Sequence, residues 1–298
     1  MTRGKLLAAA ASLALLAATA CGSSSLDQPV GGQPPSQPPT QPAEVDPALA
    51  AKLPEKIKTA GKIVIGTDAS YAPNEFLAAD GKTIQGMDVD LFNAVAAKFG
   101  VKTEWQPSDF TTIITGVQGK KYDIGISSFT INDERKQQVT MVSYFSAGTQ
   151  WATAAGNPDG FDIDNACGKT VAVQTGTVQE TDDLPARQAK CGDNKINILS
   201  FKGQDQATNA VVTGRAVAML ADSPVTAYAV KQAAGKLAPL GEVYEAAPYG
   251  YVLPKDQTDF GAAITEALKQ LKESGQYEAA LKTWGVEGGA IDDFAVNP

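Results

Sequence analysis

The segment 122–135 combines residue types that could bind a small carboxylate. It opens with a short apolar run, which predicts a strand, and continues with the hydroxyl side chains of Ser127, Ser128 and Thr130. A helix start follows, with Arg135 at its third position, so the guanidinium can turn back over the strand end. Hydroxyls, free N–H groups at a helix N-terminus and one arginine together describe a carboxylate pocket. The alternative is a surface arginine in a helix-terminal salt bridge, with serines that only close a loop.

Three further polar residues, Asp68, Thr177 and Asp222, also follow predicted strands. Small ligands of open α/β sheets bind outside the carboxyl ends of the strands. The Ser-Pro pair after Asp222 already supplies a helix N-cap and a first helical residue. Asp222 is therefore not needed as the cap of that helix, which favours a role in ligand binding. Its alternative role is to interact favourably with the helix dipole.

Arg135 and Asp222 fall in different halves of the folded chain and carry opposite charges. Facing each other across a cleft, Arg135 would bind the negative group of a zwitterion and Asp222 its positive group. Tyr71 and Phe110 could clamp the aliphatic part of such a ligand, although a single aromatic residue is more often part of the core.

Composition excludes several classes of function. The chain of 298 residues has no histidine, which rules out Ser-His-Asp and Cys-His catalysis and every His-ligated metal site. The net charge is −8, and an acidic chain without a basic cluster argues against nucleic acid as a partner. Three cysteines without a Cys-x-x-Cys pair make a structural zinc improbable. We expect no metal and no cofactor.

The N-terminus has the features of an export signal. Residues 1–20 combine a basic start with an apolar run too short to span a bilayer. Small residues then precede Cys21, which is followed by Gly-Ser-Ser-Ser. This pattern resembles a bacterial lipoprotein signal with Cys21 as the acylated residue, and the alternative is a plain secretory signal. Residues 21–48 are rich in Pro, Gln, Ser and Gly and predict a disordered tether.

The remaining two cysteines predict a disulfide. Cys167 and Cys191 flank a predicted strand and helix, and an exported protein with an even pair of cysteines usually joins them. The alternative is two buried thiols.

Alternating strand and helix patterns predict two α/β units with parallel strands and right-handed crossovers. The first unit is expected at 49–150 and 250–298, and the second, at 151–249, is inserted within it. A turn at Asp80-Gly81 predicts a hairpin-like excursion in the first unit. Clefts between such units are the usual ligand sites.

Four motifs then resemble a known family. Asp-Ala-Ser-Tyr-Ala-Pro at 68–73, Gly-Met-Asp-Val-Asp-Leu at 86–91, the segment 122–135 and Val-Gln-Thr-Gly-Thr at 173–177 occur in order. Together they resemble the family 3 solute-binding proteins of ABC transporters, which are receptors for polar amino acids. The resemblance covers about residues 62–284. It implies a periplasmic-binding-protein-like type II fold, with two lobes joined by hinge strands near Ala147–Ala152 and Tyr249–Leu253.

The resemblance also implies roles for site residues. Arg135, with backbone groups around Thr130 and Thr177–Val178, would hold the α-carboxylate of an amino acid. Asp222 and Ser128, beside Ser127, would take the α-ammonium. The ligand side chain would lie between Tyr71 and Phe110, with Asp68 at its polar end. This sequence departs from the family pattern with Asn132, with Val178 and in the stretch 141–145.

We therefore expect a lipid-anchored amino acid receptor on the outer face of the cytoplasmic membrane, which acts as a monomer and delivers its ligand to an ABC permease. Two carboxylates near the site disfavour an acidic ligand side chain and favour a basic or amide one. The alternatives are a cyclohexadienyl dehydratase-like enzyme on the same fold, with Glu180 as the nearest general acid, and a sensor domain.

Overall fold

The folded chain begins with two short helices. The computed structural model describes residues 44–298, so the predictions for the signal at 1–20, for Cys21 and for most of the tether lie outside the described residues. Helix α1 (Pro47–Ala51) starts after Asp46, whose carboxylate accepts hydrogen bonds from two N–H groups of the first turn, and α2 (Glu55–Ala60) follows. Residues 47 and 48, assigned to the tether from sequence, belong to α1, because its Leu49 packs into the core.

Strands and helices alternate in the next part of the chain, as predicted. The elements are β1 (Lys62–Thr67), α3 (Met87–Lys98), β5 (Lys102–Pro107), α4 (Phe110–Gln118), β6 (Ile124–Gly125) and α5 (Asp133–Gln138). β1 lies between β5 and β6 and runs parallel to both. Its Ile63 and Ile65 are fully buried against the apolar face of α3, which includes Phe92 and Val95. The parallel strands therefore end at one edge, where polar residues follow.

A small antiparallel sheet lies between β1 and α3 in the chain. It consists of β2 (Ser70–Tyr71), β3 (Glu75–Leu77) and β4 (Ile84–Gln85), in the order β2-β3-β4. The turn from β3 to β4 is closed by Asp80, whose carboxylate accepts hydrogen bonds from two backbone N–H groups. The hairpin predicted from Asp80-Gly81 is therefore confirmed. Glu75 is fully buried, which a short hairpin does not predict.

The second α/β unit repeats the alternation. Its elements are β8 (Thr170–Gln174), the π-helix η1 (Gln179–Asp183), α6 (Leu184–Gln188), β9 (Asn197–Phe201), α7 (Gln204–Val212), β10 (Ala218–Asp222) and α8 (Ser223–Gln232). β8 lies between β10 and β9, parallel to both. Cys167 and Cys191 form a disulfide with Cα atoms 5.3 Å apart, so the predicted pairing is confirmed.

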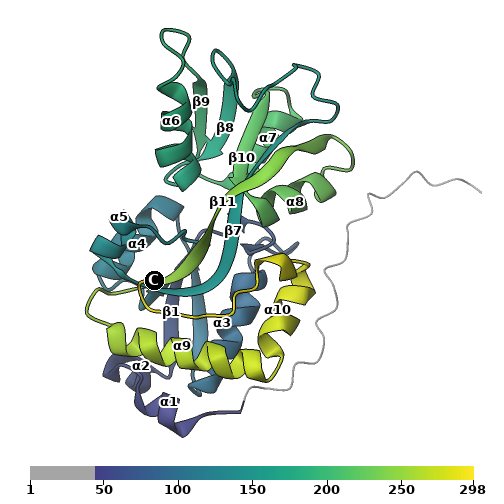
Figure 1. Ribbon diagram of the computed structural model, residues 1–298. Coiled ribbons are helices and arrows are strands. Elements are labelled where there is room, and N and C mark those ends of the chain that lie inside the picture. Colours follow the sequence, from purple (N-terminus) through teal and green to yellow (C-terminus); the bar gives the residue numbers. More distant parts are fainter. Residues whose placement is uncertain (1–43) are drawn as a thin grey trace, which may run out of the picture. The chain divides into compact units, whose positions relative to one another are not determined.

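Two long strands connect the units. β7 (Thr140–Ala154) and β11 (Leu237–Leu253) pair with each other and complete a mixed eight-stranded sheet of order β5-β1-β6-β11-β7-β10-β8-β9. Both strands run from the group of β1 and α3 to the group of β8 and β10 (Figure 1). This arrangement confirms the two-lobed α/β fold, with the second lobe inserted in the first. The lobe boundaries at 150/151 and 249/250 fall inside these strands and stay predictions.

Sequence patterns predicted only part of β7 and β11. The expected hinge segments lie within them, but β11 begins at Leu237, well before the expected hinge strand at Tyr249–Leu253. Its first half contains Pro239 and Gly241, and both residue types are rare in strands. Several residues of this half are also exposed, so they give no apolar pattern. Antiparallel pairing with β7 nevertheless extends the strand through this half, with three shifts of register between Leu240 and Gly250.

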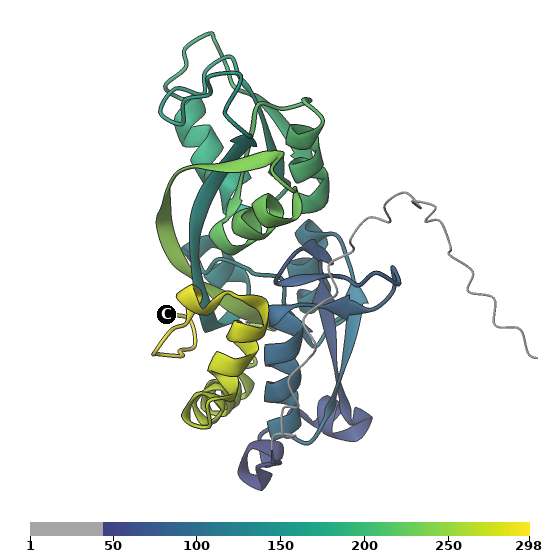
Figure 2. The same ribbon diagram turned by 90° about the vertical axis from the view of Figure 1, so that its right-hand side faces the viewer.

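The C-terminal helices return to the first lobe. α9 (Thr258–Glu273) and α10 (Gln276–Trp284) contribute buried side chains to the same core cluster as α3, and Figure 2 shows them beside that helix; a turn of 3₁₀-helix, η2 (Glu287–Gly289), follows. None of the helices within residues 44–298 is long and apolar enough to cross a membrane.

Candidate functional site

A small cavity lies where the strand ends of the two lobes meet. Its volume, counted as the space open to the centre of a water-sized sphere, is about 10 Å³, which is room for about one water molecule. The lining residues are Tyr71, Phe110, Ser127, Ser128, Thr130, Arg135, Gln174, Thr177, Val178, Gln179 and Asp222. The lining thus contains every predicted ligand-binding residue except Asp68, and it adds two glutamines.

Arg135 is a buried cation whose hydrogen-bond acceptors are backbone carbonyls. Asn132 accepts a hydrogen bond from the Arg135 backbone N–H at 2.9 Å and so starts α5 as predicted. The guanidinium donates to the carbonyls of Thr130 at 2.8 Å and of Gly176 at 3.1 Å, and Gly176 belongs to the other lobe. Burial lowers the pKa of this guanidinium, but an arginine stays protonated in any case.

The alternative role for Arg135, a surface salt bridge, does not fit its surroundings. The residue is only 8% exposed, and it takes part in none of the ion pairs within residues 44–298. A buried cation without a paired anion is costly. The site is therefore chemically suited to receive a carboxylate.

Asp222 is the opposite charge on the cavity wall. Its Oδ2 accepts hydrogen bonds from the hydroxyls of Tyr249 at 2.7 Å and Tyr71 at 2.9 Å, and its Oδ1 accepts one from Gln179 Nε2 at 2.8 Å. Burial raises the pKa of Asp222, while these donors and the charge of Arg135 oppose that rise. A buried carboxyl group held by these donors is positioned to accept a hydrogen bond from an ammonium group.

The position of Asp222 in the chain differs from the prediction. Asp222 itself, rather than Ser223, occupies the N-cap position of α8, and Pro224 lies at the second helical position. The expectation that Ser223 caps the helix was wrong. However, the Asp222 side chain makes no capping hydrogen bond, so its carboxylate is available to the cavity.

The predicted aromatic walls both reach the cavity. Phe110 stacks on Phe129, with ring centroids 4.5 Å apart, and the Arg135 guanidinium lies within 6 Å of both rings, at 5.6 and 5.4 Å. Tyr71 is 5% exposed and directs its hydroxyl at Asp222. Apolar ring faces beside two opposite charges suit a ligand with an aliphatic chain.

Asp68 does not line the cavity, because its carboxylate is used locally. Its Oδ1 accepts from the N–H and the hydroxyl of Ser70, at 3.1 and 2.6 Å, and its Oδ2 accepts from the N–H of Phe110 at 3.0 Å. The fourth donor is Gln174 Nε2 at 3.2 Å, from the other lobe. Asp68 thus closes the turn after β1 and caps the start of α4.

The two serines line the cavity but turn their hydroxyls away from a ligand. Ser127 Oγ donates to Glu75 Oε1 at 3.0 Å, and Ser128 Oγ lies 3.2 Å from Glu75 Oε2 and 3.4 Å from Asp88 Oδ2. Asn74 donates to Ser128 Oγ at 2.9 Å. The side chains therefore contact a buried acidic pair that the sequence did not connect with the site.

Thr177 and Val178 follow β8 and form the wall opposite Arg135. The Thr177 hydroxyl donates to the Gln174 carbonyl at 2.8 Å and so holds the turn. Gly176 is left-handed, with φ of +82°, and a Cβ there would lie 2.7 Å from Thr111 Cγ2 of the first lobe. Glycine is therefore required for the close approach of this turn to α4.

Sequence reasoning missed Gln174 and Gln179. Gln174 is the last residue of β8 and lies inside a motif that was recognised, so its position at a strand end was an available signal. Gln179 opens η1, two residues beyond the motif, and donates both to Asp222 and to Thr149 Oγ1, the latter at 3.0 Å. No pattern in the sequence marks that second contact.

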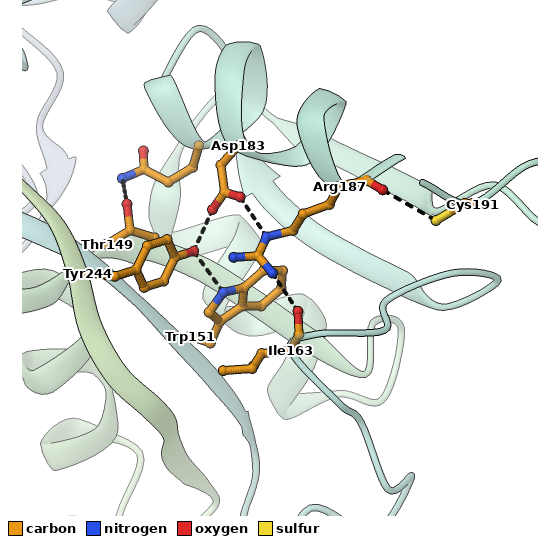
Figure 3. Close-up of polar contacts among 8 residues, drawn as sticks. Thr149, Trp151, Ile163, Asp183, Arg187, Cys191 and Tyr244 are labelled. Atoms are coloured by element: carbon orange, nitrogen blue, oxygen red, sulfur yellow. Dashed lines mark hydrogen bonds and ion pairs between the residues drawn. The ribbon is translucent and has the colours of Figure 1, made fainter. Parts of the chain in front are cut away.

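A network in the second lobe holds η1 at its far end (Figure 3). Asp183, the last residue of η1, accepts hydrogen bonds from the Tyr244 hydroxyl and from Arg187 Nε, the latter at 2.5 Å. Trp151 donates its indole N–H to the same Tyr244 oxygen at 2.8 Å, and the guanidinium of Arg187 lies against the Trp151 ring at 5.2 Å. Because both ends of η1 are anchored to β7 and β11, the direction of Gln179 is fixed.

Glu180, the candidate acid of the enzyme alternative, is occupied by the backbone. Its Oε2 accepts a hydrogen bond from the Gly176 N–H at 2.6 Å, and it is absent from the cavity lining. The Glu180 carboxylate therefore holds the turn after β8 in this structure.

Fold and site together define a two-lobed α/β protein with a cation, Arg135, and a carboxyl group, Asp222, on one cavity between its lobes. Residues 63–287 match the family described as bacterial extracellular solute-binding proteins, family 3. The chain is 38% identical over 254 residues to the arginine-binding protein ArgT of Corynebacterium glutamicum, covering 84% of this chain and 83% of that protein. It is 31% identical to the lysine/arginine/ornithine-binding periplasmic protein of Escherichia coli, covering 78% and 89%.

A solved structure shares the fold. The crystal structure of an ancestral amino acid-binding protein, a precursor of cyclohexadienyl dehydratase, is 33% identical, with a TM-score of 0.69, and covers 77% of this chain and 98% of that one. The chain belongs to family 3 of the bacterial extracellular solute-binding proteins. It is the amino acid-binding component of an ABC importer, and it acts outside the cytoplasm together with the importer's membrane component.

Proposed function

We propose that the ligand is a basic amino acid and that arginine is preferred. Both relatives described above are named for arginine or for a set that includes it. The observation that carries the proposal is that two residues line one cavity: Arg135, which has no ion-pair partner within residues 44–298, and Asp222, whose carboxylate makes no capping hydrogen bond. These charges complement the two ends of an amino acid backbone.

The hydrogen bonds of the cavity indicate how the ligand enters. The α-carboxylate would replace the Gly176 carbonyl as acceptor for Arg135, and it would also meet the backbone N–H groups near Thr177 and Val178. A charge-assisted pair is stronger than a bond to a neutral carbonyl, so the exchange is favourable. The α-ammonium would take the place of the Tyr71 hydroxyl at Asp222.

The ligand side chain would lie between the rings of Tyr71 and Phe110 and point towards Gln174. Asp68 lies behind Gln174 and already accepts four hydrogen bonds, so it would act on a cationic side chain through its charge rather than as a direct contact. A negative charge at this end favours a guanidinium or an ammonium over a carboxylate.

Binding would require the lobes to separate and close again. The cavity of about 10 Å³ has no room for an amino acid. Hydrogen bonds between the lobes close it, including those from the Tyr71 hydroxyl to Asp222 and from Arg135 to the Gly176 carbonyl. The long strands β7 and β11 would bend near the expected hinge segments Ala147–Ala152 and Tyr249–Leu253, beside the register shifts in their pairing. The ligand would favour a closed form that the permease recognises.

We also propose that Cys21 is acylated and that residues 22–46 tether the receptor to the outer face of the cytoplasmic membrane. The monomer would deliver its ligand to the permease and would bind neither nucleic acid nor a cofactor. No turnover is expected, because Glu180 is bound to the backbone rather than directed at a substrate.

Isothermal titration calorimetry tests the proposed ligand. L-arginine, L-lysine, L-ornithine, L-histidine, L-glutamine and L-glutamate would be titrated separately into the protein without residues 1–21. Binding of arginine, with lysine or ornithine weaker and glutamate undetectable, supports the proposal. Tighter binding of glutamate than of every basic amino acid would refute it.

A further inference from the structure

Two carboxyl groups lie buried beneath the serines of the cavity. Glu75 begins β3 and Asp88 lies in the first turn of α3, and both are 0% exposed. Neither takes part in any ion pair within residues 44–298. The proposed function makes no use of them, although burying carboxyl groups without a cation is costly.

The surroundings of Asp88 are those of an anion. Its Oδ2 accepts from the Tyr144 hydroxyl at 2.9 Å and from the Ser128 backbone N–H at 3.2 Å. Within the described part of the chain, the groups that donate hydrogen bonds to Glu75 are the hydroxyls of Ser127 and Ser128. Backbone N–H and phenol donors favour the ionised form more than rotatable serine hydroxyls do, because a serine can turn its proton elsewhere.

The two carboxyl groups meet at one hydroxyl, because Ser128 Oγ lies 3.2 Å from Glu75 Oε2 and 3.4 Å from Asp88 Oδ2. Two buried carboxyl groups this close, with no cation beside them, cannot both stay ionised, so one of them carries a proton. Asp88 Oδ1 is buried without a hydrogen-bond partner in the described part of the chain, and a proton on the neighbouring Glu75 carboxyl group would supply its donor. Consistent with this, burial and the Asp88 charge raise the pKa of Glu75 well above its usual value, while that of Asp88 rises to about 6.

We propose that Glu75 and Asp88 share one proton, held on Glu75, and that this acid pair positions the 127–130 segment of the amino acid site. The inference rests on the proposed function for its binding readout. Ser128 is a non-glycine residue with φ of +51°, a left-handed conformation that needs support from its surroundings. The pair supplies that support through the backbone N–H and the hydroxyl of Ser128.

The segment leads directly to the arginine. Two residues after Ser128, Thr130 bridges to Tyr249 of β11, and its carbonyl accepts the hydrogen bond from Arg135. Tyr144, the phenol donor to Asp88, stacks on Tyr251 with centroids 4.0 Å apart and planes 7° apart. The acid pair thus contacts Ser128 of the site and Tyr144 of β7, and through the Tyr144 ring it is connected to β11.

The other groups that face the pair carry no positive charge. Tyr144, Tyr251 and the side chain of Asn74 surround it, and the charges of Asp68 and the phenol of Tyr71 act on Glu75 from the cavity side. None of them is a cation, so the shared proton is the only positive charge available to the pair among these neighbours.

Two isosteric variants distinguish this arrangement from ordinary packing. Glu75→Gln keeps a donor towards Asp88, so its arginine affinity should stay within about threefold of wild type. Asp88→Asn turns an amide N–H₂ or a single neutral oxygen towards donors that need an anion, so affinity should fall by more than about tenfold. Calorimetry at pH 7 measures both, and thermal unfolding of each variant checks that it is folded.

Infrared spectroscopy reads the proton directly. The wild-type protein in D₂O at pH 7 should show the C=O stretching band of a protonated carboxylic acid, and Glu75→Gln should lack it. This readout needs no ligand, so it stands even if Asp88→Asn does not fold or no amino acid binds. Failure of every amino acid to bind wild type would refute the proposed function alone.

Three results would overturn the inference. The first is a Glu75→Gln variant that fails to fold or loses affinity as much as Asp88→Asn does. The second is the reverse asymmetry, with Asp88→Asn tolerated. The third is an infrared spectrum in which wild type and Glu75→Gln have the same carboxylic acid bands at neutral pH.

Discussion

The Tyr71 hydroxyl donates a hydrogen bond to Asp222 across the two lobes, at a distance of 2.9 Å. Tyr71 comes from the small sheet of the first lobe and Asp222 from the end of β10 in the second. The same bond joins the lobes and occupies the carboxylate that we assign to the ligand ammonium. Closure without ligand and ligand binding therefore compete for one oxygen.

Removing that hydroxyl should strengthen ligand binding. Tyr71→Phe keeps the ring wall but leaves Asp222 with one donor fewer before binding, and a net hydrogen bond is worth about 1 kcal/mol. Arginine should bind up to about fivefold more tightly in calorimetry. Tyr249→Phe is the matched control, because its hydroxyl lies on the same oxygen at 2.7 Å but outside the cavity lining, and it should not strengthen binding. Weaker binding by Tyr71→Phe would contradict the competition.

Truncating Arg135 should abolish high affinity for every amino acid. Arg135→Ala leaves the α-carboxylate without its partner, at a cost of about 3–5 kcal/mol, which corresponds to a loss of at least about a hundredfold. Lys136→Ala, at the next position of α5, is the control and should bind normally, because this lysine pairs with Asp133 and the C-terminal residue outside the cavity. An unchanged dissociation constant for Arg135→Ala would remove this residue from the site.

The unliganded protein should become more stable as the pH falls from 7 towards 5. Burial raises the pKa of Asp88 to about 6 from 3.8, and it raises that of Glu75 and Asp222 as well. A folded state with raised carboxyl pKa values binds more protons than the unfolded chain between pH 6 and 3.8, so the free energy of unfolding rises on acidification through that window.

Urea unfolding at pH 5, 6 and 7 measures this trend. Exposed carboxylates such as Asp80 and Asp292 have lowered pKa values, so they reduce the free energy of unfolding on acidification only at pH values below about 3.8, outside this range. The Asp88→Asn variant should show a smaller gain between pH 7 and 5 than wild type. A wild-type protein that loses stability steadily over this range would show that buried carboxyl groups do not govern it.

Breaking the disulfide should destabilise the second lobe. Cys167 and Cys191 are 24 residues apart, and closing a loop of that length contributes about 3–4 kcal/mol in the chain-entropy model. The variant with both cysteines replaced by alanine should unfold at lower urea concentration and still bind arginine when folded, because the bridge lies away from the cavity. An unchanged unfolding midpoint would contradict this.

The sequence predicted residues whose roles follow from local patterns. Asp222 ends β10, Thr177 lies in the turn after β8, and Arg135 lies in the first turn of α5, the helix that follows β6. Parallel strands bring such positions to one edge of the sheet. The same rule placed Asp68 in the site, but there the carboxylate serves its own turn and the start of α4. A strand-end carboxylate has both possibilities, and only the surrounding donors distinguish them.

Roles that depend on long-range packing could not be predicted. Glu75 and Asp88 read as residues of a hairpin and of an acidic helix start, which are ordinary exposed positions. Their burial follows from the packing of β3 and α3 under Ser127 and Ser128, about forty to fifty residues later in the chain. Gln179 likewise contacts Asp222, 43 residues away, through a π-helix that no periodicity marks.

In the proposed complex, opposite charges from the two lobes bind the two ends of one amino acid. Calorimetry with L-arginine and with agmatine, which lacks only the α-carboxylate, isolates the contribution of one of these ends. Wild type should bind arginine at least about a hundredfold more tightly than agmatine, and Arg135→Ala should remove most of this difference. Equal affinity of wild type for the two ligands would contradict this prediction.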